Sequence, residues 1–301
     1  MKKMSLRNNA ENRYPYIRSP GTAALNQLNS NWQASDMQLS GVRFLLIDGP
    51  NLIRRIHAAI PAAGSEQIIE QTISSSLQSL SRALKQHTPT HALCAFECSG
   101  PTWRHEYFPD YKKDRPEMPQ ELHQIFSRLQ QEIHDSGVFT LSVAGMEADD
   151  IIASAAVKAA AAGADVIILS TDTGQAQLLG PGIRQYNHFK QEPITEDSIE
   201  QRFSVTPRQL NDYLAMVGDK SHSLPGVPGI GAKTAASLLE TYASLEEILN
   251  AAEEIGGRIG NSLAEHRDSA MMVKKLLALR TDISLGQTLR SFRYRKDEPA
   301  F

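Results

Sequence analysis

Hydrophobic residues gather in four short runs between residues 42 and 172, and segments with helical spacing lie between them. The runs cover 42–48, 91–97, 137–143 and 165–172. Each is almost continuously apolar, as in strands that are buried on both faces of a parallel sheet. Apolar residues recur every three or four positions over 68–85, and an alanine-rich stretch covers 147–162, so both predict helices. The alternation of strand and helix predicts an α/β fold with a parallel sheet.

After about residue 190 the pattern becomes helical and no further strand is predicted. Helical spacing covers 197–203, 206–217, 232–242, 245–250 and 271–279. We therefore expect an α/β domain over 42–195, a helical domain over 196–285 and a C-terminal tail over 286–301. Within the α/β domain, the polar segment 98–136 separates the second and third strands.

Residues 1–41 show no sustained periodicity, and their polar composition predicts a disordered extension. An upstream start codon, with the true start near Met37, is an equivalent interpretation. A transit peptide is the remaining alternative, because the segment is poor in acids.

Composition narrows the class of protein. Of the 301 residues, 41% are hydrophobic and 22% are charged, which is typical of a folded globular chain. No apolar run approaches the roughly 20 residues that span a bilayer, and no apolar leader opens the chain, so we expect a cytoplasmic protein without a membrane partner. Cys94 and Cys98 do not form a disulfide framework. The net charge of −3 gives no global positive field for nucleic acid, although bound divalent cations would more than offset it.

Acidic residues follow three of the predicted strands and open one predicted helix. Carboxyl ends of parallel strands meet at one edge of a sheet, so we expect seven acids there: Asp48, Glu97, Glu147, Asp149, Asp150, Asp172 and Asp219. Carboxylates this close raise one another's pKa unless cations neutralise them, and their oxygens suit Mg²⁺ or Mn²⁺. Each acid alone could be a helix-capping or turn residue. Their coincidence predicts a metal site.

The stretch 224–231 (LPGVPGIG) joins two predicted helices, and five of its eight residues are Gly or Pro. Glycines let the backbone approach a phosphate, and the first N–H groups of the next helix point at an anion. Lys233 and Thr234 add a charge and a hydroxyl. The pattern predicts a helix-hairpin-helix that grips duplex backbone without reading bases, and unpaired helix-end carbonyls nearby could hold a monovalent cation. An ordinary helical turn is the alternative.

The segment 103–119 interleaves basic and aromatic side chains. Arg104, Lys112, Lys113 and Arg115 alternate with four aromatic residues, and four acids balance the charge. This mixture suits a frayed single strand, through phosphate contacts and base stacking. A solvated helical excursion is the other interpretation.

Taken in order, these elements resemble the 5′-nuclease family, which includes bacterial flap endonucleases and the 5′-nuclease domain of DNA polymerase I. The matching stretches are 46–51 (LIDGPN), 103–119, 145–150 (GMEADD), 170–172 (STD) and 218–234. The absence of a polymerase part and the run 51–58 resemble the stand-alone Xni type. The resemblance implies a PIN-like parallel-sheet nuclease domain, an arch within 98–136, and a helical domain whose helix-hairpin-helix (H3TH) element is 224–234. It also implies Mg²⁺-dependent hydrolysis of phosphodiesters at 5′ flaps, with K⁺ in the hairpin.

The resemblance also assigns roles to residues. Asp149 is the expected principal Mg²⁺ ligand, joined by Glu147, Asp150 and Glu97, while Asp172 and Asp219 serve a second ion. Asp48, Lys112 and Arg115 are the expected catalytic residues, the two cations acting on the phosphate. Backbone carbonyls are the expected K⁺ ligands: Met216, Val217, Pro225, Val227 and Ile230. The expected DNA contacts are Arg104, Gly229, Ile230, Gly231, Ala232, Lys233 and Thr234.

Three positions depart from the family pattern. Two family acids fall at Gly174 and His222, and Glu97 stands where Asp is usual. We therefore expect one well-held Mg²⁺ and a weak second site. The predicted function is a structure-selective DNA 5′-nuclease that acts as a monomer on 5′ flaps or branched ends. The alternatives are a non-catalytic DNA-junction-binding module, which the two missing acids favour, and a PIN-like RNase, against which the hairpin argues.

Overall fold

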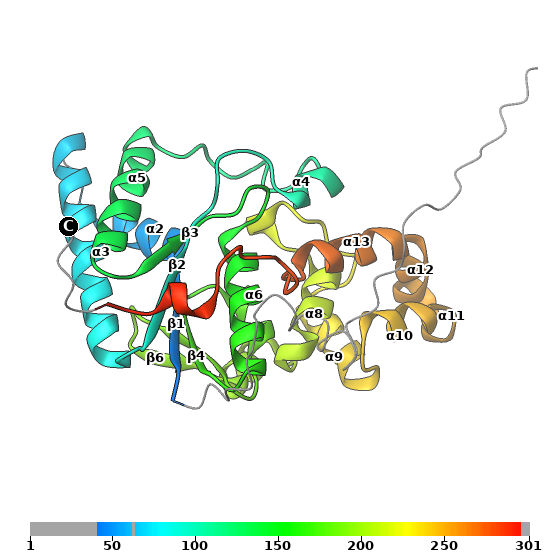
Figure 1. The fold of residues 1–301 in the computed structure, drawn as a ribbon. Helices are drawn as coiled ribbons and strands as arrows, with labels where there is room; N and C mark the ends of the chain where they lie inside the picture. Colours follow the sequence, from blue (N-terminus) through cyan, green and yellow to red (C-terminus); the bar gives the residue numbers. More distant parts are fainter. Residues whose placement is uncertain (1–40, 62–63, 296–301) are drawn as a thin grey trace, which may run out of the picture. The chain divides into compact units, whose positions relative to one another are not determined.

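The computed structural model of the chain describes residues 41–61 and 64–295. The predictions for residues 1–40 and 296–301 lie outside this described part. The sheet has the order β3-β2-β1-β4-β5-β6, and all neighbouring strands are parallel except β5 and β6. The four predicted strands are confirmed as β1 (Arg43–Asp48), β2 (His91–Ala95), β3 (Phe139–Leu141) and β4 (Asp165–Leu169). The predicted α/β class is therefore correct (Figure 1).

Two strands were not predicted. They are β5 (Ile183–Asn187) and β6 (Glu192–Ile194). The expectation that no strand follows residue 190 is therefore wrong, because the short edge strand β6 lies beyond it. Three of the five residues of β5 are polar, and one of them, Gln185, is buried. The strand therefore has neither the apolar run nor the regular alternation that would predict it. The Gln185 side-chain amide donates to the carbonyls of Ser170 and Asp172, at 3.1 and 2.7 Å. β5 thereby fixes the chain just beyond β4.

Helices cover both faces of the sheet. On one side lie α2 (Gly49–Ala59), α3 (Ser65–His87) and α5 (Gln120–Asp135), and their apolar residues pack with Leu45 and Ile47 of β1. On the other side lies α6 (Ala148–Ala161), against β1 and β4 (Figure 1). The periodicity of α5 lies in the segment that was interpreted as a substrate excursion, which is why that helix was not predicted.

The helical part follows β6 and has an apolar core of its own. The predicted helices are confirmed as α7 (Glu196–Phe203), α8 (Leu210–Val217), α9 (Ala232–Thr241), α10 (Leu245–Asn250) and α13 (Arg267–Leu277). Two more, α11 (Ala252–Ile255) and α12 (Gly257–Glu265), were not predicted. No helix in the described ranges is long and apolar enough to cross a membrane.

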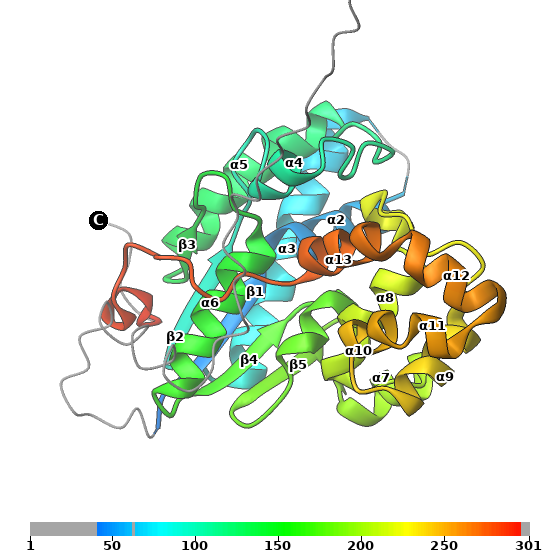
Figure 2. The ribbon, with the colours of Figure 1, turned by 90° about the vertical axis from the view of Figure 1, so that its right-hand side faces the viewer.

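The chain returns to the sheet after α13. Phe292 stacks on Phe44 of β1 with ring centroids 5.5 Å apart, and Arg293 forms an antiparallel bridge with His91. The first half of the predicted C-terminal tail is thus packed against β1 and β2 (Figure 2).

Candidate functional site

Three carboxylates lie where β1, β4 and α6 meet, and neutral groups of the chain orient them. Asp48 ends β1 and accepts hydrogen bonds from the Asn51 amide at 3.0 Å and the Ser170 hydroxyl at 2.8 Å. Asp149, in the first turn of α6, accepts from the Gln175 side-chain amide at 2.6 Å. Asp172 follows β4 and accepts from the Gly174 amide at 2.7 Å. None of the three carboxylates forms an ion pair with any described residue.

The pKa values of Asp48 and Asp149 rise, as expected for clustered carboxylates without counter-charge. Burial raises the pKa of Asp48 to about 7, and the charges of Asp172 and Glu97 add to the effect. Burial also raises the pKa of Asp149 well above its ordinary value, followed by the charges of Asp48 and Asp172. A bound cation would relieve this repulsion.

Asp150 has a different environment, because it is fully buried and its oxygens are occupied by donors of the chain. Arg104 binds it through two nitrogens at 2.6 and 2.8 Å, and the Trp103 indole and the Arg280 amide each donate at 3.0 Å. In this structure Asp150 therefore fixes the position of the Arg104 guanidinium. Arg104 is 2% exposed, and its guanidinium also binds the carbonyls of Leu276 and Ala278. Its contact with DNA stays a prediction.

Glu147 precedes α6 and is bound by cations of the predicted arch. The Lys112 ammonium lies 2.8 Å from one of its oxygens, while Arg104 and the Tyr111 hydroxyl donate to the other at 3.2 Å. Burial acts to raise the pKa of Glu147, but the charges of Lys112 and Arg104 outweigh it and the pKa is lowered. In this state Lys112 neutralises an acid of the site.

Asp219 follows α8 and is bound by His222, a position at which the resemblance predicts an acid. The His222 ring nitrogen Nδ1 lies 2.6 Å from its carboxylate, and Ser221 donates through its amide and hydroxyl at 2.8 and 2.6 Å. Burial opposes ionisation, yet the bonds to His222 and Ser221 lower the pKa of Asp219 to about 2. The face of the His222 ring stacks on Tyr111.

A pocket of about 290 Å³ brings several of the predicted residues together. The acids that line it are Glu147, Asp149, Asp172 and Asp219, with Gly174 and His222 beside them. Glu97 is exposed at the end of β2, and Arg115 is exposed on the arch. No three acidic, His or Cys side chains of the described residues yet stand close enough to enclose an ion. The donors nevertheless fit a hard divalent cation, because they are carboxylate oxygens without a competing thiolate.

Sequence reasoning missed residues that orient or adjoin these acids, such as Gln175, Ser170 and Arg54. Arg54 of α2 lies over the Phe126 ring at 5.6 Å. Its pKa is lowered by burial and by the charge of Arg115.

The glycine-proline hairpin is built by close backbone approach. A Cβ atom at Gly226 would overlap the Val217 carbonyl, and the Val227 amide donates to the Met216 carbonyl at 2.7 Å. The N-terminus of α9 has no side-chain cap, and the residues around it are exposed from Gly231 to Lys233. Exposed amides at a helix N-terminus can bind a phosphate.

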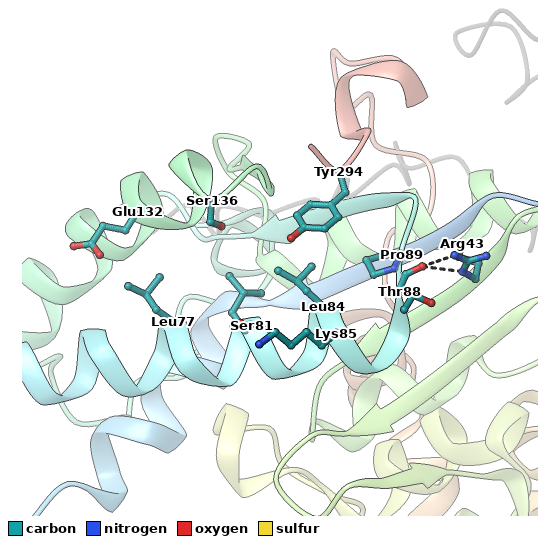
Figure 3. A pocket seen from close by; sticks show the side chains of 11 residues that line it. Arg43, Leu77, Ser81, Leu84, Lys85, Thr88, Pro89, Glu132, Ser136 and Tyr294 are labelled. Carbon is teal, nitrogen blue, oxygen red and sulfur yellow. Dashed lines mark hydrogen bonds between the residues drawn. The ribbon is translucent and has the colours of Figure 1, made fainter. Parts of the chain in front are cut away.

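A larger hollow, of about 740 Å³, lies between α3, α5 and Tyr294 (Figure 3). Arg43 and Thr88 line it. These residues lie at the amino ends of the strands, opposite to the edge that carries the acids.

Comparison with known proteins gives consistent matches over both parts of the chain. The model of the 5′-3′ exonuclease N-terminal resolvase-like domain matches residues 43–204, and that of the 5′-3′ exonuclease C-terminal SAM fold matches 205–300. Flap endonuclease Xni of Shewanella loihica is 39% identical over 251 residues, which is 83% of this chain and 96% of the relative. Flap endonuclease Xni of Psychromonas ingrahamii is 37% identical over 252 residues, 83% and 96% of the two chains.

Solved structures share the fold at low sequence identity. Zinc-bound T5 5′-exonuclease superposes with a TM-score of 0.68 and 20% identity, over 79% of this chain and 90% of the other. The catalytic core of Rad2 in complex with a DNA substrate has a TM-score of 0.54 and 11% identity, over 86% and 83%.

Proposed function

The chain belongs to the 5′-3′ exonuclease family, and we propose that it is a structure-selective nuclease that hydrolyses DNA phosphodiesters at 5′ flaps or branched ends. The observation that carries the proposal is the acid-lined pocket, whose wall includes the loop from Gly218 to His222. That loop leads directly into the hairpin and the exposed N-terminus of α9. A duplex backbone on the hairpin would thus lie beside the carboxylates.

We propose Mg²⁺ as the divalent ion. Asp149 would be the principal ligand of a well-held ion with Asp48 beside it, and Asp172 would belong to a weaker second site. An ion bound there would lower the pKa of a bound water and neutralise charge on the phosphate. Glu147 and Asp219 line the same pocket, and they would become metal ligands once Lys112 and His222 no longer bind them. Glu97 would act through water, whereas Asp150 would act through Arg104.

The cations of the arch complete the proposed site. The Lys112 ammonium lies 2.8 Å from Glu147, which lines the pocket, so a small side-chain movement would transfer it from Glu147 to a phosphate oxygen. Arg115 is exposed on the same segment and would contact the same strand. A positioned cation stabilises the charge that develops on a reacting phosphate. Contacts from Gly229 to Thr234 would fix the duplex without reading its sequence.

We also propose that K⁺ binds at the hairpin through the carbonyls of Met216, Val217, Pro225, Val227 and Ile230. Replacing K⁺ by a bulky organic cation at constant ionic strength should weaken duplex binding more than single-strand binding. Equal duplex affinity in both salts would remove this assignment.

Cleavage assays on matched substrates test the function. A labelled 5′-flap DNA should be cut with Mg²⁺ and remain intact with EDTA, while an RNA copy of the flap and a blunt duplex should be cut far less. Tight flap binding without cleavage would favour the non-catalytic junction-binding module. Preferential cutting of the RNA would favour the PIN-like RNase. Sedimentation of the free protein tests the proposed monomer.

A further inference from the structure

Two segments far apart in the sequence meet beside the acid pocket through a set of specific contacts. One is Tyr111–Asp114 of the arch, and the other is the loop Asp219–Ser223; we call their contact the arch–loop junction. The rings of Tyr111 and His222 stack with centroids 5.5 Å apart and planes inclined by 11°. The Lys112 amide donates to the His222 carbonyl at 2.9 Å, and the Asp114 amide donates to the Ser223 hydroxyl at 3.2 Å.

The backbone on both sides of this junction has an unusual conformation. Lys112 has φ +58° and Ser223 has φ +55°, both in the left-handed region that non-glycine residues seldom adopt. Such conformations persist where the surrounding structure holds them. The stacked rings and the two hydrogen bonds between these segments supply that restraint.

His222 supplies two of these contacts, the stack through its ring and the bond from Lys112 through its backbone carbonyl. Its ring is bound to Asp219 on the loop at 2.6 Å and lies on the arch residue Tyr111. Tyr111 is 3% exposed, and its hydroxyl donates to Glu147. The next residue, Lys112, binds the other oxygen of Glu147. An aspartate at position 222 could not provide the ring face.

We propose that His222 is a positioning residue that fastens the arch to the loop and so sets where the Lys112 ammonium stands at the pocket. The inference rests on the proposed function for its effect on cleavage, but the junction itself can be tested without any substrate. Removing the ring leaves Tyr111 without its stacking partner, so the left-handed backbone of Lys112 keeps only the two hydrogen bonds from Lys112 and Asp114 as its restraint. Small displacements of a positioned group are costly in rate.

The first experiment measures hydrogen exchange over Tyr111–Asp114 in the DNA-free, metal-free full chain. His222→Ala removes the ring, His222→Phe keeps an aromatic face but loses the bond to Asp219, and His123→Ala is a matched control on the exposed face of α5. We expect His222→Ala to exchange about tenfold faster over this segment. His222→Phe and His123→Ala should exchange like wild type. Unchanged exchange over β1 and β4 in every variant excludes global unfolding as the cause.

The second experiment measures single-turnover cleavage of a 5′-flap DNA at saturating Mg²⁺, together with flap affinity in EDTA. His222→Ala should lower the cleavage rate by about 10- to 100-fold and leave the affinity nearly unchanged, because the hairpin holds the duplex. His222→Phe should restore most of the rate. Absence of cleavage by wild type would refute the proposed function, while the exchange experiment would still decide the junction.

Two results would overturn the inference. One is a His222→Ala protein that exchanges and cleaves like wild type. The other is a His222→Phe protein as impaired as His222→Ala, which would assign the effect to the bond with Asp219.

Discussion

The carboxylates around the pocket divide into two groups with opposite electrostatics. Asp48, Asp149 and Asp172, the strand-end group, are oriented by neutral hydroxyl and amide donors. The arch-facing group is bound by Lys112, Arg104 and His222 of the chain itself; its members are Glu147, Asp150 and Asp219. The pKa values of Asp48 and Asp149 are raised, whereas those of Glu147 and Asp219 are lowered.

The difference shows that acids in one family motif can serve separate tasks. Glu147, Asp149 and Asp150 are nearly adjacent in sequence, yet successive residues of a helix start point in different directions. Asp149 feels the charges of Asp48 and Asp172 and forms no ion pair with a described residue. Glu147 and Asp150 face the arch and hold it through buried ion pairs. We therefore expect a substitution of Asp149 to lower the cleavage rate and a substitution of Asp150 to lower the stability of the fold.

The largest expected effect is on cleavage by Asp149→Asn. The change removes charge from the group that has no cation of its own, so cleavage of flap DNA with Mg²⁺ should fall by about a thousandfold or more. DNA binding in EDTA should stay near wild type. Asp135→Asn, at the exposed end of α5, is the matched control and should cleave normally. An Asp149→Asn protein with nearly full activity would place the ion elsewhere.

The second effect is on stability, through Asp150→Asn. Arg104 would remain buried with Glu147 as its remaining acidic partner, and breaking a buried ion pair costs about 3 kcal/mol. Urea unfolding in EDTA measures this loss without any metal. Asp282→Asn, which breaks the exposed pair with Arg280, should cost less than about 1 kcal/mol. Equal losses in the two variants would show that burial does not distinguish the groups.

Much of the fold could be predicted because its sheet is parallel and buried. Continuous apolar runs identified β1 to β4, and periodicity identified α3 and α6. The polar strand β5 was not predicted, because the burial of Gln185 depends on hydrogen bonds to the residues just after β4. The proposed domain division near residue 195 remains a prediction.

The site was predictable as a set of acids but not as two groups. Strand order alone brings Asp48 and Asp172 to one edge. The pairing of Asp150 with Arg104 joins residues 46 positions apart, and no local sequence pattern predicts it. Arg104 was therefore assigned to DNA, since a basic residue among aromatics gives the same sequence signal whether it is exposed or buried.

The third prediction is a pH dependence of stability in the strand-end group. The folded pKa of Asp48 is about 7 against an ordinary 3.8, so the folded state keeps a proton that the unfolded state loses between these values. Stability from this group is present below about pH 4 and is lost as pH rises through 7. Asp48→Asn removes the cost of ionising this side chain in the folded state. In EDTA the free energy of unfolding of the variant should exceed that of wild type by an amount that grows from pH 5 to 8, reaching on the order of 1–3 kcal/mol.

Thermal melting of both proteins across that pH range measures the difference. Mg²⁺ should shrink it, because a bound cation favours the ionised Asp48 of wild type. An advantage that is constant with pH would mean that Asp48 ionises normally and that the strand-end group does not lack counter-charge.

The smallest expected effect tests whether the strand-end group can be strengthened. Gly174 is a position at which the resemblance predicts an acid, and its amide donates to Asp172. A Cβ atom at this position would lie 3.2 Å from the Asp172 carboxylate, so a carboxylate introduced there adds charge beside the proposed second ion at the cost of a tight contact. Gly174→Asp should lower the Mg²⁺ concentration for half-maximal cleavage by about three- to tenfold, since Mg²⁺ binds chiefly through carboxylate charge. Gly174→Asn has the same shape without the charge, and it should leave the Mg²⁺ requirement unchanged or raise it. If both variants shift the requirement equally, side-chain shape rather than charge limits the second site.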